Sequence, residues 1–164
     1  ALEKGTIDAA EWCCPKPDSV FGFQKVLKHY YLQGLHQVVV NADLYLNGDV
    51  FAALTPLQQK AIEVAANASL MKAMAYRINE NGKALDKLIN EDGVQLHDTP
   101  AEYFTEYMAA ANAALEKNAS ENAFFKEVWD SQKAFARTAV PYWAQAQRTN
   151  ANLGAAYAET LKKQ

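Results

Sequence analysis

The apolar positions in the first third of the chain are spaced as in strands and short turns. Residues 6–12 alternate between apolar and polar side chains, which predicts a short strand. A turn with two prolines follows, and either Asp18 or Ser19 can cap a short helix after it. Residues 30–32 and 35–46 are rich in tyrosine, valine and leucine, which favours strands. The pattern therefore predicts an α/β segment.

From residue 55 onward the spacing of the apolar positions is that of helices. Thr55 and Pro56 are a strong N-cap and first-turn pair, and apolar side chains then recur every three or four residues. These side chains are Leu57, Ala61, Val64, Ala68, Met71, Ala75 and Ile78. A stripe of this kind is most often the core-facing side of a helix, so we predict that it is buried. We expect Gly82 to interrupt the helix, with a second helical stretch reaching about residue 90.

The remaining residues are predicted to form three helices and one short strand. Thr99 and Pro100 are the start signal of one helix, and Ser120 and Glu121 are that of the next. Residues 94–97, before these helices, are suited to an edge strand. Pro141 is expected to kink or end the second of these helices. Residues 142–163 then form a final, mostly polar helix. The chain as a whole is therefore helix-rich, with its strands near the N-terminus.

Composition narrows the classes of protein that this sequence can belong to. The chain has 164 residues, of which 50% are hydrophobic and 21% charged, with a formal net charge of −3. It contains no run approaching 18 apolar residues, so no membrane-spanning helix is expected. Mild acidity with scattered basic residues argues against a nucleic-acid binder. The opening residues 1–5 resemble the last turn of a helix with a glycine C-cap, so we expect the chain to be part of a longer protein.

Candidate binding chemistry is concentrated at the end of the first predicted strand. Glu11 and Trp12 stand there, and the C-terminal ends of strands are where open α/β sheets place their ligands. Glu11 is suited to bind a metal ion or to act as a general base, and Trp12 to stack on a small organic ligand. The alternative is an ordinary surface glutamate beside a core tryptophan. Gln37 offers an amide group to the same region, or is simply an exposed amide.

The two cysteines of the chain, Cys13 and Cys14, are adjacent. They lack the spacing of a zinc site, and no nucleophile, phosphate-binding or dinucleotide-binding motif accompanies them. In an oxidising compartment they can close a strained vicinal disulfide, whereas in a reducing one they remain small, partly buried thiols. Both alternatives stay open on the sequence.

One stretch of the sequence resembles a known family. It is Gly5-Thr6-Ile7-Asp8-Ala9-Ala10-Glu11-Trp12, which is similar to the solute-binding subunits of TRAP (tripartite ATP-independent periplasmic) transporters, the DctP family. The similarity is greatest to the branch that binds 2-oxo and 2-hydroxy monocarboxylates. It continues through Gly22-Phe23, Tyr30-Tyr31, Gly34 to Gln37 and Leu54 to Ile62, with weaker matches near Phe124 and Ser131.

The resemblance implies an α/β, helix-rich fold that is the C-terminal portion of a two-lobed periplasmic binding protein (type II-like) with a long helical tail. Residues 1–54 would form a fragment of an α/β lobe with ligand-binding strand ends. Residues 55–140 would form helices that pack on and between the lobes, and residues 141–164 a C-terminal helical extension. The resemblance also implies a periplasmic location and no enzymatic activity.

The same resemblance assigns residues to a binding site. Glu11, Trp12 and Gln37 occupy the positions at which this branch meets its carboxylate ligand and a bridging Na⁺ or Ca²⁺ ion, so all three are expected ligand- and metal-binding residues. Two departures stand out, because Cys13 and Cys14 replace small residues and Gln37 stands where glutamate is expected. A neutral amide brings one negative charge fewer, which weakens the binding of a divalent ion. The arginine that pairs with the ligand carboxylate lies upstream of this sequence.

The partners implied are a small organic acid and the membrane subunits of a sodium-driven transporter. The last helix carries Leu153, Tyr157 and Leu161 on one face, and we expect it to contact a second subunit in a homodimer, as in some members of the branch. A tail folded back on its own domain is an equally open alternative. The other functions considered are a binding protein for a dicarboxylate or an aromatic acid, a helical interaction module, and an enzyme that uses Glu11 as a base.

Overall fold

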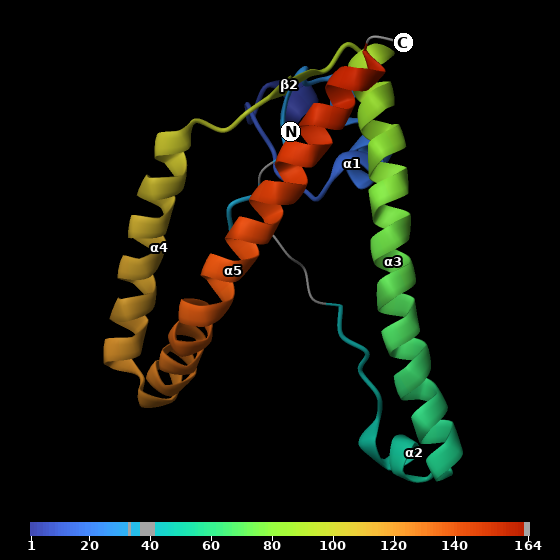
Figure 1. The fold of residues 1–164 in the computed structure, drawn as a ribbon, viewed down its shortest axis with the longest axis vertical. Coiled ribbons are helices and arrows are strands. Elements are labelled where there is room, and N and C mark those ends of the chain that lie inside the picture. The colour runs from blue at the N-terminus through green and yellow to red at the C-terminus, as the bar shows by residue number, and fades with distance from the viewer. Residues whose placement is uncertain (33, 37–41, 163–164) are drawn as a thin grey trace. The chain divides into compact units, whose positions relative to one another are not determined.

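The chain folds into two compact units, residues 1–101 and 102–164. The computed structural model describes residues 1–32, 34–36 and 42–162. The elements of the first unit, in order, are η1 (Leu2–Lys4), α1 (Pro15–Phe21), η2 (Phe23–Lys25), β1 (His29–Tyr31), α2 (Gly48–Ala52), α3 (Pro56–Asn90) and β2 (Gln95–His97). The second unit consists of α4 (Ala101–Glu121), whose first residue belongs to the first unit, and α5 (Ala123–Leu161). Figure 1 shows these elements along the chain.

Residues 6–12 do not form the predicted strand. An isolated strand leaves its backbone groups unpaired, and in the described part of the chain the one ladder joins β1 to β2. Residues 42–46 are likewise not a strand, and residues 37–41 of that predicted strand lie outside the described residues. The predictions for residues 30–32 and 94–97 are confirmed to within one residue by β1 and β2.

Helix α1 begins four or five residues earlier than predicted, since the predicted N-cap was Asp18 or Ser19. Its N-cap is Cys14 in extended conformation. Pro15 follows at the first helical position, where its lack of a backbone N–H leaves no donor unpaired. Asp18 and Ser19 therefore lie inside the helix and cap nothing. The helix ends at Gly22, whose φ of 79° is left-handed, a conformation that favours glycine.

Helix α3 starts at the predicted position but is longer than predicted. Thr55 and Gln58 form a capping box at its start, and the helix continues through Gly82 to Asn90. A single glycine costs a helix only about 1 kcal/mol, and Ala84 and Leu88 beyond it are buried. The α1 helix packs on α3, and Asn81 Oδ1 accepts a hydrogen bond from the backbone N–H of Lys16 at 2.9 Å. Burial and this bond hold the helix intact where the glycine favours a break.

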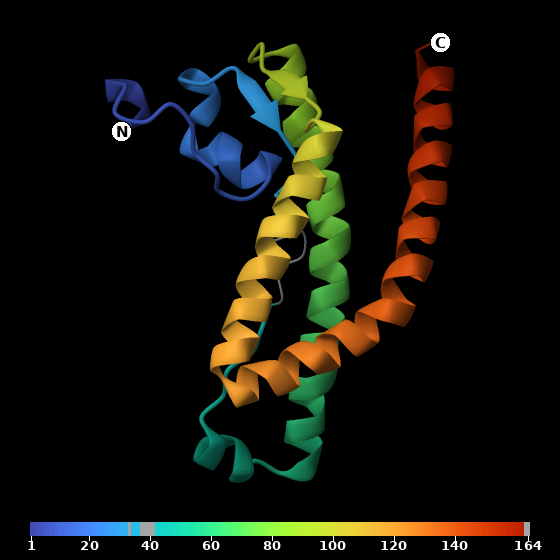
Figure 2. The same ribbon diagram turned by 90° about the vertical axis from the view of Figure 1, so that its left-hand side faces the viewer.

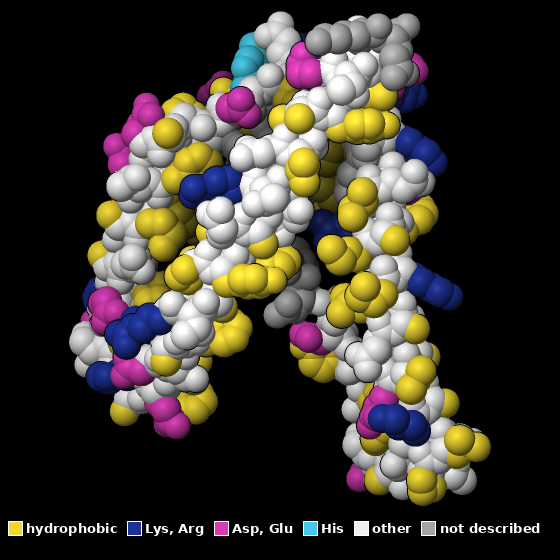
Figure 3. Space-filling model, in the orientation of Figure 1, with side chains coloured by type: hydrophobic (Ala, Val, Ile, Leu, Met, Phe, Trp, Pro, Cys, Tyr) yellow, Lys and Arg dark blue, Asp and Glu magenta, His cyan; other side chains and the backbone are white. Residues whose placement is uncertain are grey.

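The predicted burial of the apolar stripe on α3 is wrong for the described residues. Leu57, Val64, Met71 and Ile78 are all exposed, and Leu57 keeps 80% of its surface accessible. Apolar side chains cover much of the visible surface of α3 (Figure 3). The buried apolar residues among those described are Ala84, Leu88, Val94 and Ala119. Among the described residues, none covers this stripe, which is therefore an exposed apolar surface.

Strands β1 and β2 form a parallel pair in which Tyr30 is opposite Leu96. Val94 is buried just before β2, and the backbone N–H of Gln95 donates to the Lys28 carbonyl at 2.7 Å. Parallel strands need a long crossover connection, which here includes α2 and α3. The small sheet thus brings residues 29–31 next to residues 95–97.

The second unit is a hairpin of two long helices (Figure 2). Asn122 separates them and caps α5 by accepting a hydrogen bond from the Phe125 N–H at 2.9 Å, two residues beyond the predicted start. Pro141 does not end α5, which continues to Leu161 and bends along its length. The expected C-terminal extension is therefore continuous with the helix before it.

Candidate functional site

A cavity of about 420 Å³ lies in the first unit and is a candidate binding site. Its wall is formed by residues 8–14, by side chains of η2 and β1, and by Leu88 and Val94. The extended segment before α1 brings Glu11 and Trp12 to this wall, and their predicted role as ligand- and metal-binding residues stays a prediction. A volume of this size suits a small organic ligand.

Glu11 lies next to His36. Their side chains, Oε2 of Glu11 and Nε2 of His36, are 3.6 Å apart, and both are exposed. An exposed pair of this kind contributes little to stability, so the Glu11 carboxylate is available to a ligand or a cation. His36 directly precedes Gln37 in the chain. Gln37 itself lies outside the described residues, and its role remains a prediction.

Trp12 presents its ring at the surface of the cavity. It is 56% exposed, and its ring meets that of Phe21 edge-on with centroids 5.1 Å apart. Such edge-to-face contacts fix the orientation of an aromatic ring while leaving its faces free. Phe21 in turn stacks against Phe23 at 6.1 Å. Trp12 is therefore in contact with Phe21 and still exposes more than half of its surface, which a flat or apolar ligand can cover.

Asp18 connects the Glu11–Trp12 segment to strand β1. Its Oδ1 accepts the backbone N–H of Cys13 at 3.1 Å, and its Oδ2 accepts the Tyr30 hydroxyl at 2.6 Å. Asp18 is only 8% exposed. Burial, together with the hydrogen bond to the Asp18 carboxylate, raises the pKa of the Tyr30 hydroxyl. This buried bridge fixes the backbone directly after Glu11 and Trp12.

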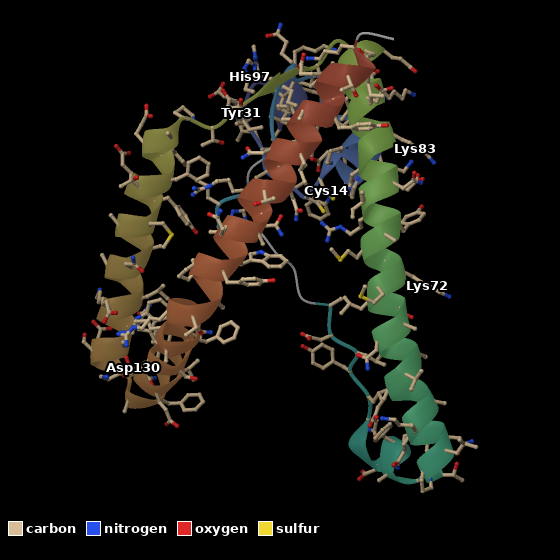
Figure 4. The ribbon with its side chains drawn as sticks, in the orientation of Figure 1. Cys14, Tyr31, Lys72, Lys83, His97 and Asp130 are labelled. Carbon is tan, nitrogen blue, oxygen red and sulfur yellow. The ribbon has the colours of Figure 1, made fainter. Side chains whose placement is uncertain are left out.

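The cysteine pair also lies in the cavity wall. The two sulfur atoms, of Cys13 and Cys14, are 2.9 Å apart as free thiols. The hydrogen bond to Cys14, with a smaller effect of burial, raises the pKa of Cys13 to about 11. Figure 4 places Cys14 beside α3. Their oxidation to a disulfide remains a prediction.

The charges in the wall are mainly negative. Asp8, Glu11 and Asp18 all line the cavity, whereas the ammonium group of Lys28 donates to the carbonyls of Gln24 and Asp92 at 2.8 Å each. A bare carboxylate ligand would therefore meet a field of its own sign. In the described ranges, no group of three or more histidine, cysteine, aspartate or glutamate side chains is arranged to hold a metal ion.

Sequence reasoning missed three residues of this region: Asp18 as a buried bridge, Tyr30 and His36. A usable signal exists for Tyr30, because β1 alternates and only its middle residue turns inward. His36 lies beside Glu11, which is 25 positions away in the sequence, and no local pattern predicts such a contact.

Comparison with known proteins identifies the family. Residues 1–122 match the family model DctP, described as bacterial extracellular solute-binding protein, family 7. The chain belongs to the DctP family. It is 32% identical over 139 residues to a monocarboxylate 2-oxoacid-binding periplasmic protein of Nostoc sp. (strain PCC 7120), which covers 82% of this chain and 37% of that protein.

The DctP fold is also shared with a solved structure. A TRAP transporter solute-binding protein from Bordetella bronchiseptica RB50 matches with a TM-score of 0.76 and 28% identity, covering 100% of this chain and 48% of that one. That structure is described as a mixed-occupancy dimer with copurified calcium and picolinate in one active site and an apo second site. The chain thus spans about half the length of the solved relative and less of the curated one.

These findings confirm the predicted family and the helix-rich α/β fold of a solute-binding protein. They also confirm that the relatives are binding proteins of transporters and not enzymes. The helices of the described residues include none that is both long enough and apolar enough to span a membrane.

Proposed function

We propose that this chain provides one wall of the ligand site of a periplasmic TRAP solute-binding subunit that captures a small 2-oxo or 2-hydroxy monocarboxylate. The observation that carries the proposal is the position of Glu11 and Trp12 at one cavity of the DctP fold. The names of the relatives support it, since one binds monocarboxylate 2-oxoacids and another holds picolinate.

The acid is proposed to bind together with a cation. Among the described residues, the part of the wall that this chain supplies has three carboxylates and one ammonium group that already donates two hydrogen bonds, so this wall by itself disfavours a bare anion. Glu11 and Gln37 would hold a Ca²⁺ or Na⁺ ion through side-chain oxygens, with Trp12 beside it, and the ion supplies positive charge to the carboxylate of the ligand. The calcium of the Bordetella protein is consistent with this arrangement.

The test is calorimetric titration of pyruvate and lactate into the longer protein that contains this chain, with CaCl₂ or with a chelator. We expect binding that requires the cation, and a Glu11→Gln variant that loses affinity at least about tenfold, because a charged oxygen ligand is removed. Glu63→Gln is the matched control, since Glu63 is an exposed glutamate on α3 paired with Lys60. Tight binding by Glu11→Gln would overturn the assignment.

Trp12 gives a second, optical reading of the same site. The chain has three tryptophans, so Trp12→Phe should remove the fluorescence change on ligand addition, whereas Trp143→Phe should keep it. Competition with a dicarboxylate and with picolinate separates the proposed ligand class from the two alternatives within the family. The preferred acid is the one that displaces the others.

Delivery to membrane subunits for sodium-driven uptake from the periplasm is proposed on the family alone. A homodimer through α5 is the further part of this proposal, because Leu153, Tyr157 and Leu161 are all exposed on that helix and the Bordetella relative is a dimer. Deletion of residues 142–164 should convert a dimer to a monomer in light scattering. A monomeric wild type, or a deletion that remains dimeric, contradicts it.

A further inference from the structure

Two of the three histidines of the chain meet across the small sheet of the first unit. His29 Nδ1 and His97 Nε2 are 2.9 Å apart, and the ring centroids are separated by 5.0 Å. The two residues are 68 positions apart in sequence and come together because β1 and β2 pair in parallel. The binding site proposed above uses neither of their facing nitrogens.

The sheet register fixes this pair. His29 is opposite Gln95, and Tyr31 is opposite His97, so the two histidines are diagonal neighbours on adjacent strands. The ring of Tyr31 stacks on that of His97 with centroids 5.2 Å apart, which restricts rotation of His97 (Figure 4). His29 is exposed and His97 half-buried, so a solvated ion can reach both.

The separation of the two nitrogens is that of neighbouring ligands on one metal ion. With metal–nitrogen bonds of about 2.05 Å, two ligands at 90° lie about 2.9 Å apart, and two at the tetrahedral angle about 3.35 Å apart. In this structure the two facing nitrogens share a hydrogen bond, and replacing its proton by an ion needs a smaller movement of the rings for the 90° arrangement of square-planar and octahedral ions than for a tetrahedral one. Imidazole is a preferred ligand of copper and nickel, which adopt these geometries.

We propose that His29 and His97 form a two-histidine site for Cu²⁺ or Ni²⁺. The ring that donates in the His29–His97 hydrogen bond moves its proton through solvent to its outer nitrogen, and two neutral rings then bind the ion without net proton release. Water fills the other positions, since the described residues contain no larger cluster of metal-ligating side chains. His29 lies in the wall of the same cavity as Glu11, but neither histidine of this pair is among the residues proposed to hold the cation there.

A bound ion would connect β1 to β2. The strands share a ladder of only three residue pairs, and a metal that binds both of them stabilises the folded state in proportion to its occupancy. The thermal midpoint of the first unit should therefore rise with Ni²⁺ concentration. This effect does not require the organic acid, and it is measured in its absence.

The test is titration of NiCl₂ into the protein after removal of any histidine tag. His29→Gln and His97→Gln should each lower the affinity about tenfold or more, because each removes one of two protein ligands. His36→Gln is the matched control and should stay within about twofold of wild type. Zn²⁺ should bind more weakly than Ni²⁺.

A second measurement keeps the proposal testable if a variant folds poorly. The electron paramagnetic resonance spectrum of Cu²⁺ on the wild-type protein should show coordination by two imidazole nitrogens. Coordination by one or none overturns the site, as does unchanged Ni²⁺ affinity in both glutamine variants. Loss of binding in His36→Gln alone would place the ion at Glu11 instead.

Discussion

The two units of the chain are held together by different interactions. In residues 1–101, short segments far apart in sequence meet around Ala84, Leu88 and Val94, with the carboxylate of Asp18 buried beside them. In the described residues of the second unit, 102–162, one residue, Ala119, is buried, and the hydrogen bond and ion pair that join the two helices are exposed. Burial therefore dominates the first unit and surface electrostatics contribute more to the second. The candidate binding site lies in the unit that depends on burial.

The hairpin contacts of the second unit are centred on Glu116. It accepts the Trp129 indole N–H at 2.8 Å and pairs with Lys133 at 3.0 Å, and Lys133 also lies over the Trp129 ring at 5.5 Å. The Trp129 hydrogen bond and the Lys133 pair together lower the pKa of Glu116. Asp130 pairs with both Lys126 and Lys133. The network joins α4 to α5 without a large buried surface.

The largest effect is expected from removing a buried side chain of the first unit. Leu88→Ala should lower the free energy of unfolding of that unit by about 2–5 kcal/mol, because Leu88 is only 3% exposed. The matched control is Leu57→Ala on the same helix. Urea unfolding followed by Trp12 fluorescence, with Trp129 and Trp143 replaced by phenylalanine, isolates the first unit. If Leu88→Ala and Leu57→Ala lower the free energy of unfolding equally, burial does not dominate the stability of the first unit.

The next effect concerns the buried bridge. Asp18→Ala leaves the Cys13 N–H and the Tyr30 hydroxyl without their acceptor, at a cost of about 1–3 kcal/mol for each group left unsatisfied. Asp86→Ala is the control, since the Asp86 carboxylate is an exposed acceptor on α3. Asp18→Ala should also weaken ligand binding, because the backbone after Trp12 loses its anchor. If Asp18→Ala is as stable as Asp86→Ala, the Asp18 bridge does not stabilise the fold.

The bridge formed by Asp18 illustrates what local sequence patterns can and cannot predict. The cap at Thr55 was predictable because capping depends on three or four consecutive residues. Glu11 and Trp12 line a cavity, and their predicted role as binding residues rests on their position before a turn and on the family resemblance. The role of Asp18 was not predictable, since it depends on Tyr30, which lies 12 residues away on another element. The strand predicted at residues 6–12 failed for the same reason, because a strand requires a neighbour that its own sequence does not specify.

An alkaline titration tests the same bridge by its pH dependence. The pKa of Tyr30 is raised in the folded state above its unfolded value of about 10. Its contribution to stability is therefore fully present below about pH 10 and is lost as the pH rises through the folded value. Absorbance at 295 nm should show one of the eight tyrosines ionising last, and Tyr30→Phe should remove that step. Ionisation of all tyrosines together contradicts it.

The smallest effect is expected in the second unit. Lys133→Met removes the ion pairs to Glu116 and Asp130 while keeping an apolar side chain of similar length. Because exposed pairs are weak and are screened by salt, the variant should be slightly less stable at low ionic strength and equal to wild type at 1 M salt. Trp129 fluorescence in a Trp12→Phe background reports on this unit. A deficit that persists in high salt would mean that packing, and not charge, joins the hairpin.

The parallel pairing of β1 with β2 has a consequence for the order in which the chain folds. It joins His29 to Gln95, so the intervening segment must close into a large loop before the sheet and the buried residues around it can form. Loop closure costs entropy that is recovered only when these distant contacts are complete, and such topologies fold slowly. The α4–α5 hairpin, by contrast, requires contacts over 13 to 17 positions. The wall that carries Glu11 and Trp12 therefore belongs to the part of the chain that reaches its native structure last.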